Sequence, residues 1–179
     1  NIMQRLYEHH KVLTYPRTDS RYIGSDIVPT IKERLKACNI GPYKAYIPAL
    51  LKAPICTSKA FVDDKKVSDH HAIIPTEEYV QLDRMSNEER KIYDLVVRRF
   101  IGVLYPAYEY EQTTMKATVQ TSAKPSVATA VFGAKGQVVL KEGWKAVYDN
   151  MSLDEEEDDK SGDQLRLAGQ QLPTLKKGQ

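Results

Sequence analysis

Residues 13–22 bring a tyrosine, a proline and an arginine together, and small hydrogen-bonding residues follow them at once. Proline restricts the residue before it to extended geometry, so Tyr15 is predicted to be strand-like. Side chains two residues apart in an extended run face the same way, and we therefore expect Tyr15 and Arg17 to project together. A phenol, with a usual pKa of about 10, must lose its proton to attack a phosphodiester, and a nearby guanidinium favours that loss and can grip phosphate oxygens. The pattern indicates a nucleophilic tyrosine, although the same residues also fit a surface cation–π pair.

The histidines form two adjacent pairs, His9–His10 and His70–His71. Neighbouring side chains diverge on a helix or a strand, so neither pair is expected to bind one metal ion by itself. The first pair fits an exposed helix end. The second pair separates a polar Ser-Asp from an apolar Ala-Ile-Ile-Pro. One of its imidazoles could hydrogen-bond a phosphate oxygen or relay a proton, with Asp69 nearby to set its tautomer.

Composition favours a soluble protein of one large or two small domains, with 179 residues, 41% hydrophobic and 28% charged residues, and a net charge of +2. No apolar run approaches the roughly 18 residues of a membrane span. Cys38 and Cys56 match no zinc or redox spacing, which predicts two reduced, partly buried thiols in a cytoplasmic protein. The chain starts and stops within patterned segments, so we expect a monomeric piece of something larger.

Helices are expected in the first part of the chain, at residues 2–10, 26–38 and 45–51, and from a capping box at Ser86 and Glu89 to about Leu104. Past Pro106 the hydrophobic period changes to two. This change predicts an antiparallel meander of about three strands, with turns at residues 124–126 and 133–136. The expected fold class is α+β. The buried stripe of the last helix is predicted to contain Ile92, Leu95, Val96, Phe100 and Val103, with Arg98 and Arg99 on or near its outer face.

Two stretches together carry a resemblance: T-Y-P-R-T-D-S-R-Y at residues 14–22 and D-H-H-A-I-I-P-T at residues 69–76. They resemble the central region of the type IA DNA topoisomerases, most closely the bacterial topoisomerase III subgroup. Residues 143–148 and 172–179 are similar to that family's return through its arch. The resemblance implies a helical active-site domain at residues 1–104, followed by an antiparallel β segment of the arch at residues 105–150. An acidic flexible loop at 151–164 and a truncated return strand at 165–179 would then follow.

The resemblance also implies roles for individual residues. Tyr15 would attack a phosphodiester of single-stranded DNA and become joined to the 5′ phosphate, leaving a free 3′ hydroxyl. Arg17 would stabilise the phenolate and the charge on the phosphate, and His70, at the histidine of H-x-A-I-x-P-T, would hydrogen-bond that phosphate. Because the phosphotyrosine keeps the energy of the broken bond, rejoining needs no ATP. Residues expected to bind DNA or support the site are Thr18, Asp19, Ser20, Arg21 and His71.

The family holds Mg²⁺ in a separate Toprim domain through an acidic D-x-D cluster, and this chain contains no D-x-D. We therefore expect no metal site in this chain, which would depend on the remaining domains of its polypeptide and be inactive alone. The full-length protein would relax or decatenate DNA. Rolling-circle nicking enzymes and tyrosine recombinases fit less well, because their His-x-His and His-x-x-Arg patterns are missing. The alternative is a single-stranded-DNA-binding or interaction module whose Tyr15 is only structural.

Overall fold

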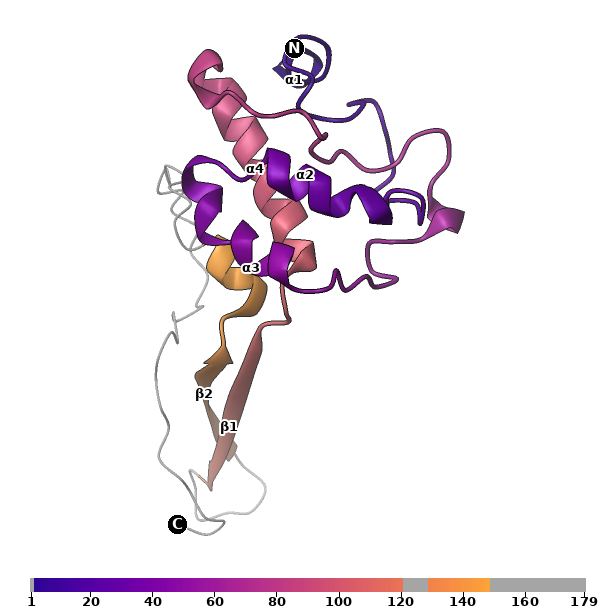
Figure 1. Ribbon diagram of the computed structural model, residues 1–179. Coiled ribbons are helices and arrows are strands. Elements are labelled where there is room, and N and C mark those ends of the chain that lie inside the picture. Colours follow the sequence, from indigo (N-terminus) through magenta and orange to yellow (C-terminus); the bar gives the residue numbers. More distant parts are fainter. Residues whose placement is uncertain (1, 121–128, 149–179) are drawn as a thin grey trace. The chain divides into compact units, whose positions relative to one another are not determined.

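The computed structural model describes residues 2–120 and 129–148, which fall into two units. Residues 2–106 and 144–148 form a helical unit, and residues 107–120 and 129–143 form a β unit (Figure 1). This composition confirms the α+β class. The turn expected at residues 124–126 and the segments expected at 151–164 and 165–179 lie outside the described residues. No helix in the described ranges is both long and apolar enough to cross a membrane.

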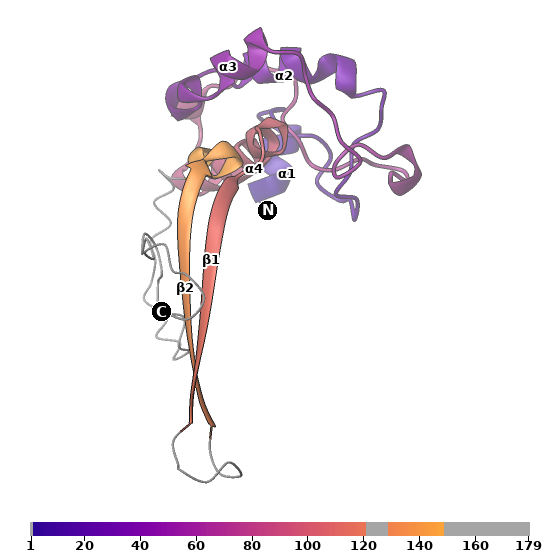
Figure 2. The ribbon, with the colours of Figure 1, turned by 90° about the horizontal axis from the view of Figure 1, so that it is seen from below.

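The helical unit contains α1 (Ile2–Glu8), α2 (Ile31–Ala37), α3 (Ile47–Lys52) and α4 (Asn87–Leu104). Helix α1 packs against α4, and α2 packs against α3 (Figure 2). Short 3₁₀ turns connect them, and the turn at Val28–Thr30 replaces the beginning of the helix predicted from residue 26. The largest side chains at the centre of the core are Leu6, Leu13, Ile31, Leu35, Tyr43, Ile47, Tyr93 and Ile101.

Helix α4 begins with the predicted capping box. The Ser86 side chain accepts from the Glu89 backbone N–H at 3.2 Å, and the Glu89 side chain accepts from the Ser86 backbone N–H at 2.8 Å. The helix ends at Leu104, as predicted.

The predicted inward face of α4 is confirmed in part: Phe100 is buried, the half-buried Ile92, Val96 and Val103 pack against the core, and the prediction is wrong for Leu95. Leu95 is 43% exposed and Arg98 is buried, where it binds Asp94 and the Val147 carbonyl. Residues 92–104 are apolar on most sides, so helical periodicity could not select one face. The fully buried positions lie one residue further along, at Glu89, Tyr93, Val97 and Ile101.

Helix α1 leads into the segment of Tyr15 through an unusual backbone conformation. Lys11 has a φ of 57°, in the left-handed region that side chains other than glycine seldom adopt. The chain reverses there and Leu13 enters the core, where it forms an isolated antiparallel bridge with Pro75. The strand expected at Tyr15 is therefore reduced to this bridge, and Pro16 lies at a bend.

The β unit is one antiparallel ribbon of β1 (Glu109–Gln120) and β2 (Thr129–Lys141). Two strands are present in the described residues, not about three. The turn predicted at residues 133–136 is wrong, because β2 runs through it with Gly133 opposite Lys116 and Gly136 opposite Thr113. The glycines suggested a turn, but cross-strand pairing with residues 113–116 keeps this segment extended.

Candidate active site

The two motifs of the sequence are joined side by side by hydrogen bonds. The Thr14 backbone N–H donates to the Ile74 carbonyl at 3.0 Å, and the Thr76 N–H donates to the Val12 carbonyl at 3.0 Å. The Thr76 hydroxyl also donates to the Lys11 carbonyl at 2.6 Å. The segment before Tyr15 is therefore fixed along the segment that follows His70.

Thr14 completes this connection with its side chain. Its hydroxyl donates to the Ala72 carbonyl at 3.3 Å and accepts from the Ile74 N–H at 3.0 Å. A hydroxyl can donate and accept at the same time, which a methyl group cannot do. Thr14, which directly precedes Tyr15, is thus bonded through its side chain to the backbone of Ala72 and Ile74, shortly after His70.

The Tyr15 and His70 rings are in contact. Their centroids lie 4.3 Å apart, with 38° between the ring planes. Tyr7 of α1 packs edge-on against Tyr15 from another direction, with centroids 5.4 Å apart. Tyr15 is partly buried between these rings and His70 is exposed. The imidazole is therefore close enough to contact a phosphate that the phenol would attack.

Tyr15 and Arg17 line two different cavities. One, of about 210 Å³, contains Tyr15 and His71; the other, of about 320 Å³, contains Arg17 and Thr18. Asp69 and His70 line both. The expected projection of Tyr15 and Arg17 into one space is not observed, because the bend at Pro16 interrupts the extended run.

The Arg17 side chain is exposed and unpaired. Its guanidinium has no hydrogen bond or ion pair to any residue that the structure describes, and it lines the second cavity. The Arg17 guanidinium is therefore available to donate hydrogen bonds to a phosphate in the cavity that Arg17 and His70 both line.

The small residues after Arg17 shape the loop rather than line up toward Tyr15. The Thr18 hydroxyl donates to the His70 carbonyl at 3.1 Å and accepts from the Ser20 N–H at 3.1 Å. The Ser20 hydroxyl donates to the Lys66 carbonyl at 2.9 Å. Asp19 is exposed on the Arg17 cavity. Thr18 and Ser20 thus hold the loop against residues 66–70.

His71 and Arg21 point to other contacts. The His71 ring Nδ1 lies 2.7 Å from the Ala72 carbonyl, so this carbonyl can fix the tautomer of His71. Arg21 lines a third cavity that does not include Tyr15 or His70.

Arg34 supports the site, and sequence reasoning missed it. It is only 7% exposed and donates from Nη1 to the Pro75 carbonyl at 2.8 Å. It also bonds the Thr30 hydroxyl and pairs with Glu77 at 2.7 Å. Burial lowers the pKa of Arg34. Its position three residues after Ile31, on the buried side of α2, was the available signal.

Glu89 connects α4 to the end of α1. It is buried at 2% exposure and lies 3.0 Å from Arg5 and 3.4 Å from the His10 ring. The Ser86 N–H lowers the pKa of Glu89. The His9–His10 pair is therefore not simply an exposed helix end, because the His10 side chain is only 12% exposed.

A metal ion does not fit the described part of the site. Within residues 2–120 and 129–148, no group of three or more His, Cys, Asp or Glu side chains could hold one. Both cysteines are free thiols, but only Cys38 is buried, and Cys56 is exposed rather than partly buried as expected. Burial raises the pKa of Cys38 to about 11, which makes it unreactive.

The family model for DNA topoisomerases matches residues 1–179. The chain therefore belongs to the DNA topoisomerase family. It is similar to DNA topoisomerase 3 of Bacillus cereus, at 53% identity over 178 residues, and to DNA topoisomerase 3 of Bacillus subtilis, at 48% identity over 178 residues. Each alignment covers 99% of this chain and 22% of the relative, so the chain spans about a fifth of their length. The resemblance to the topoisomerase III subgroup of the type IA enzymes is confirmed.

Proposed function

We propose that Tyr15 is the nucleophile with which a type IA DNA topoisomerase cleaves and rejoins single-stranded DNA. The observation that carries this proposal is the ring contact of 4.3 Å between Tyr15 and His70. That contact lies where the two motifs are hydrogen-bonded to each other. A purely structural tyrosine would not need an exposed imidazole and an unpaired arginine on adjoining cavities.

The proposed reaction is an exchange of one phosphodiester for another. The Tyr15 oxygen loses its proton and bonds to phosphorus, the bond from phosphorus to the 3′ oxygen breaks, and the 3′ oxygen gains a proton. The reverse step restores the DNA, so no water or ATP is consumed. Arg17 and His70 stabilise the charge on the phosphate oxygens. Thr18, Asp19, Ser20, Arg21 and His71 shape the loop or contact the DNA.

The remaining assignments follow from this function. Residues 1–104 are the proposed active-site domain, and the β ribbon is the proposed part of the arch, whose expected bounds of 105–150 also include residues 144–148 of the helical unit. The full-length protein is a cytoplasmic enzyme that uses Mg²⁺ held by its Toprim domain to relax or decatenate DNA. The isolated chain is monomeric, and it leaves negatively supercoiled plasmid unrelaxed when Mg²⁺ is supplied.

Substitution of Tyr15 by Phe in the full-length protein tests the proposal. The substitution removes the attacking oxygen and keeps the ring that packs on His70. We expect no covalent 5′-phosphotyrosyl DNA after denaturation, together with nearly normal binding of a single-stranded oligonucleotide. Tyr7→Phe is the matched control, because Tyr7 packs on Tyr15. A covalent adduct that persists in Tyr15→Phe would rule Tyr15 out and favour the non-catalytic DNA-binding module.

A further inference from the structure

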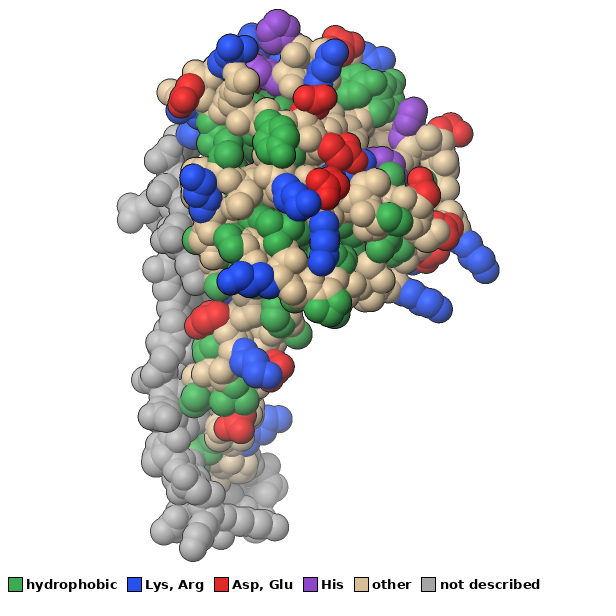
Figure 3. Space-filling view, in the orientation of Figure 1, with side chains coloured by type: hydrophobic (Ala, Val, Ile, Leu, Met, Phe, Trp, Pro, Cys, Tyr) green, Lys and Arg blue, Asp and Glu red, His purple; other side chains and the backbone are tan. Residues whose placement is uncertain are grey.

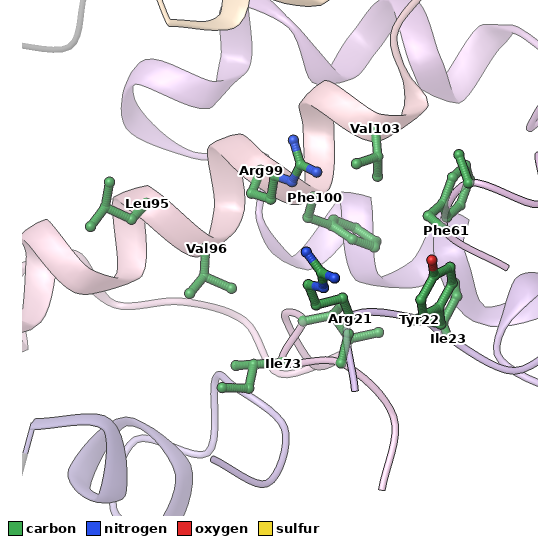
Figure 4. Close-up of a pocket in the computed structure, with 13 residues that line it drawn as sticks. Arg21, Tyr22, Ile23, Phe61, Ile73, Leu95, Val96, Arg99, Phe100 and Val103 are labelled. Atoms are coloured by element: carbon green, nitrogen blue, oxygen red, sulfur yellow. The ribbon is translucent and has the colours of Figure 1, made fainter. Parts of the chain in front are cut away.

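A cavity of about 380 Å³ lies between α4 and the segments that follow Tyr15 and His70 (Figure 4). Its apolar wall includes Val96, Phe100 and Val103 of α4, together with Phe61 and Ile73. The α4 positions are part of the stripe that was predicted to face the core. The half-buried Val96 and Val103 therefore pack against the core on one side and line this cavity on the other.

Two arginines line this otherwise largely apolar cavity. Arg21 comes from the loop after Tyr15 and Arg99 from α4, and both are exposed. Figure 4 shows both guanidinium groups near the Phe100 ring. Neither makes a hydrogen bond or an ion pair with a described residue, and no acidic side chain lines the cavity. The face of the molecule drawn in Figure 3 mixes acidic, basic and hydrophobic side chains.

We propose that this cavity binds one nucleotide of single-stranded DNA, with the base among the apolar side chains and its phosphate on Arg21 and Arg99. Guanidinium groups hold phosphate oxygens, and aromatic rings bind bases by stacking regardless of sequence. A volume of about 380 Å³ is within the range of pockets for small ligands. The proposal rests on the proposed function, in that the ligand is the DNA strand on which Tyr15 acts.

The cavity is connected to Tyr15 by continuous backbone. Residues 70–74 run from the ring contact at His70 to Ile73 and Ile74 on the cavity wall. The Ala72 N–H donates to the Tyr22 carbonyl at 2.8 Å, which pairs this segment with the loop that carries Arg21. Three extended residues span about 10 Å. A strand held at Tyr15 therefore reaches the cavity within a few nucleotides.

Equilibrium binding of a fluorescent oligothymidylate to the full-length protein tests the site. The measurements use a Tyr15→Phe background over a series of salt concentrations, so that binding is read without the reaction. Arg21→Gln with Arg99→Gln removes the contacts to one phosphate, and we expect the slope of log K against log salt to fall by about 0.7. Ala60→Trp fills the cavity from an exposed position on its wall and should weaken binding about ten-fold with little change in slope.

The control pair Lys44→Gln with Arg84→Gln removes the same charge from exposed positions outside the cavity, and its slope should stay near that of the parent. The proposal would be overturned if the slope of log K against log salt fell equally in the arginine pair and in the control pair. Unaltered DNA binding in Ala60→Trp would also overturn it. If Ala60→Trp lowers the melting temperature of the full-length protein and leaves DNA binding intact, the cavity is covered by another polypeptide segment instead. A covalent adduct that persists in Tyr15→Phe would refute the nucleophile and leave this binding result standing.

Discussion

The His70 ring rests against the Tyr15 ring with centroids 4.3 Å apart, and the His70 carbonyl accepts a hydrogen bond from Thr18 at 3.1 Å. The residue that faces the phenol is thus held at its backbone by the loop that follows the phenol. This arrangement leaves the exposed imidazole free to turn toward a phosphate while its Cα stays in place.

His70→Ala is expected to slow formation of the covalent adduct by about 100- to 1,000-fold, the usual effect of removing one donor to a developing negative charge. Affinity for single-stranded DNA should change little, because the loss falls on the transition state. Single-turnover cleavage of an end-labelled oligonucleotide measures the rate. His9→Ala is the control, since His9 is an exposed histidine at the end of α1. Equal rates for the His70→Ala and unsubstituted proteins would exclude a role for the imidazole.

Arg17→Lys tests whether geometry or charge matters at the second cavity. Lysine keeps the positive charge but loses the planar fork that grips two phosphate oxygens. We expect the cleavage rate to fall by about ten-fold in Arg17→Lys, and further in Arg17→Gln, which lacks the charge as well. The same single-turnover assay gives both rates, with Arg84→Gln as a control for an exposed charge. An unchanged cleavage rate in Arg17→Gln would show that Arg17 does not bind the phosphate that Tyr15 attacks.

Thr14→Val removes the hydroxyl that joins the two motifs and keeps the shape of the side chain. The Ile74 N–H then loses its acceptor, which should lower the free energy of unfolding by about 1–3 kcal/mol. Thr14→Ser restores the hydroxyl and should recover most of that loss. Denaturant titration of the three proteins supplies the comparison, and Thr57→Val controls for an exposed threonine. If Thr14→Val were as stable as the parent, the hydroxyl would not be holding the motifs together.

Glu89 should make stability depend on acidity. The Ser86 N–H holds the pKa of Glu89 below its usual range, with further help from Arg5 and His10. The stabilisation is therefore complete above the unfolded pKa of about 4.3 and is lost as the pH falls through the lower folded pKa. Glu89→Gln should flatten that part of the curve of unfolding free energy against pH.

Thermal melts between acidic and neutral pH measure the effect. Glu78→Gln, at an exposed position, provides the comparison for one lost carboxylate. An acid slope unchanged in Glu89→Gln would show that other carboxylates cause it.

Local signals were sufficient for the ends of α4, because the capping box and Pro106 lie next to the residues that they control. They were not sufficient for its inward face. Residues 92–104 offer Tyr93, Val97 and Ile101 on one side, and Val96 and Val103 on another. Only packing against α1 and the rest of the core decides between two apolar faces.

The site itself came from resemblance and not from periodicity. Nothing local to Thr14 indicates that its hydroxyl binds Ala72 and Ile74. The position of Arg34 on the buried side of α2 indicates burial, but it does not indicate the partner, because Pro75 lies 41 residues further along the chain. Contacts of this kind depend on how distant segments meet, which a pattern within one segment does not encode.

The bond from Ile74 to Thr14 closes a loop of 60 residues, and this has a consequence during synthesis. Tyr15 leaves the ribosome well before the segment that orders it, and loop closure must precede the gain from these contacts. A nascent chain that ends before His70 therefore carries the Tyr15 phenol without the His70 imidazole and without the hydrogen bonds between Thr14 and residues 72–74. The proposed nucleophile is organised only after translation has passed the second motif.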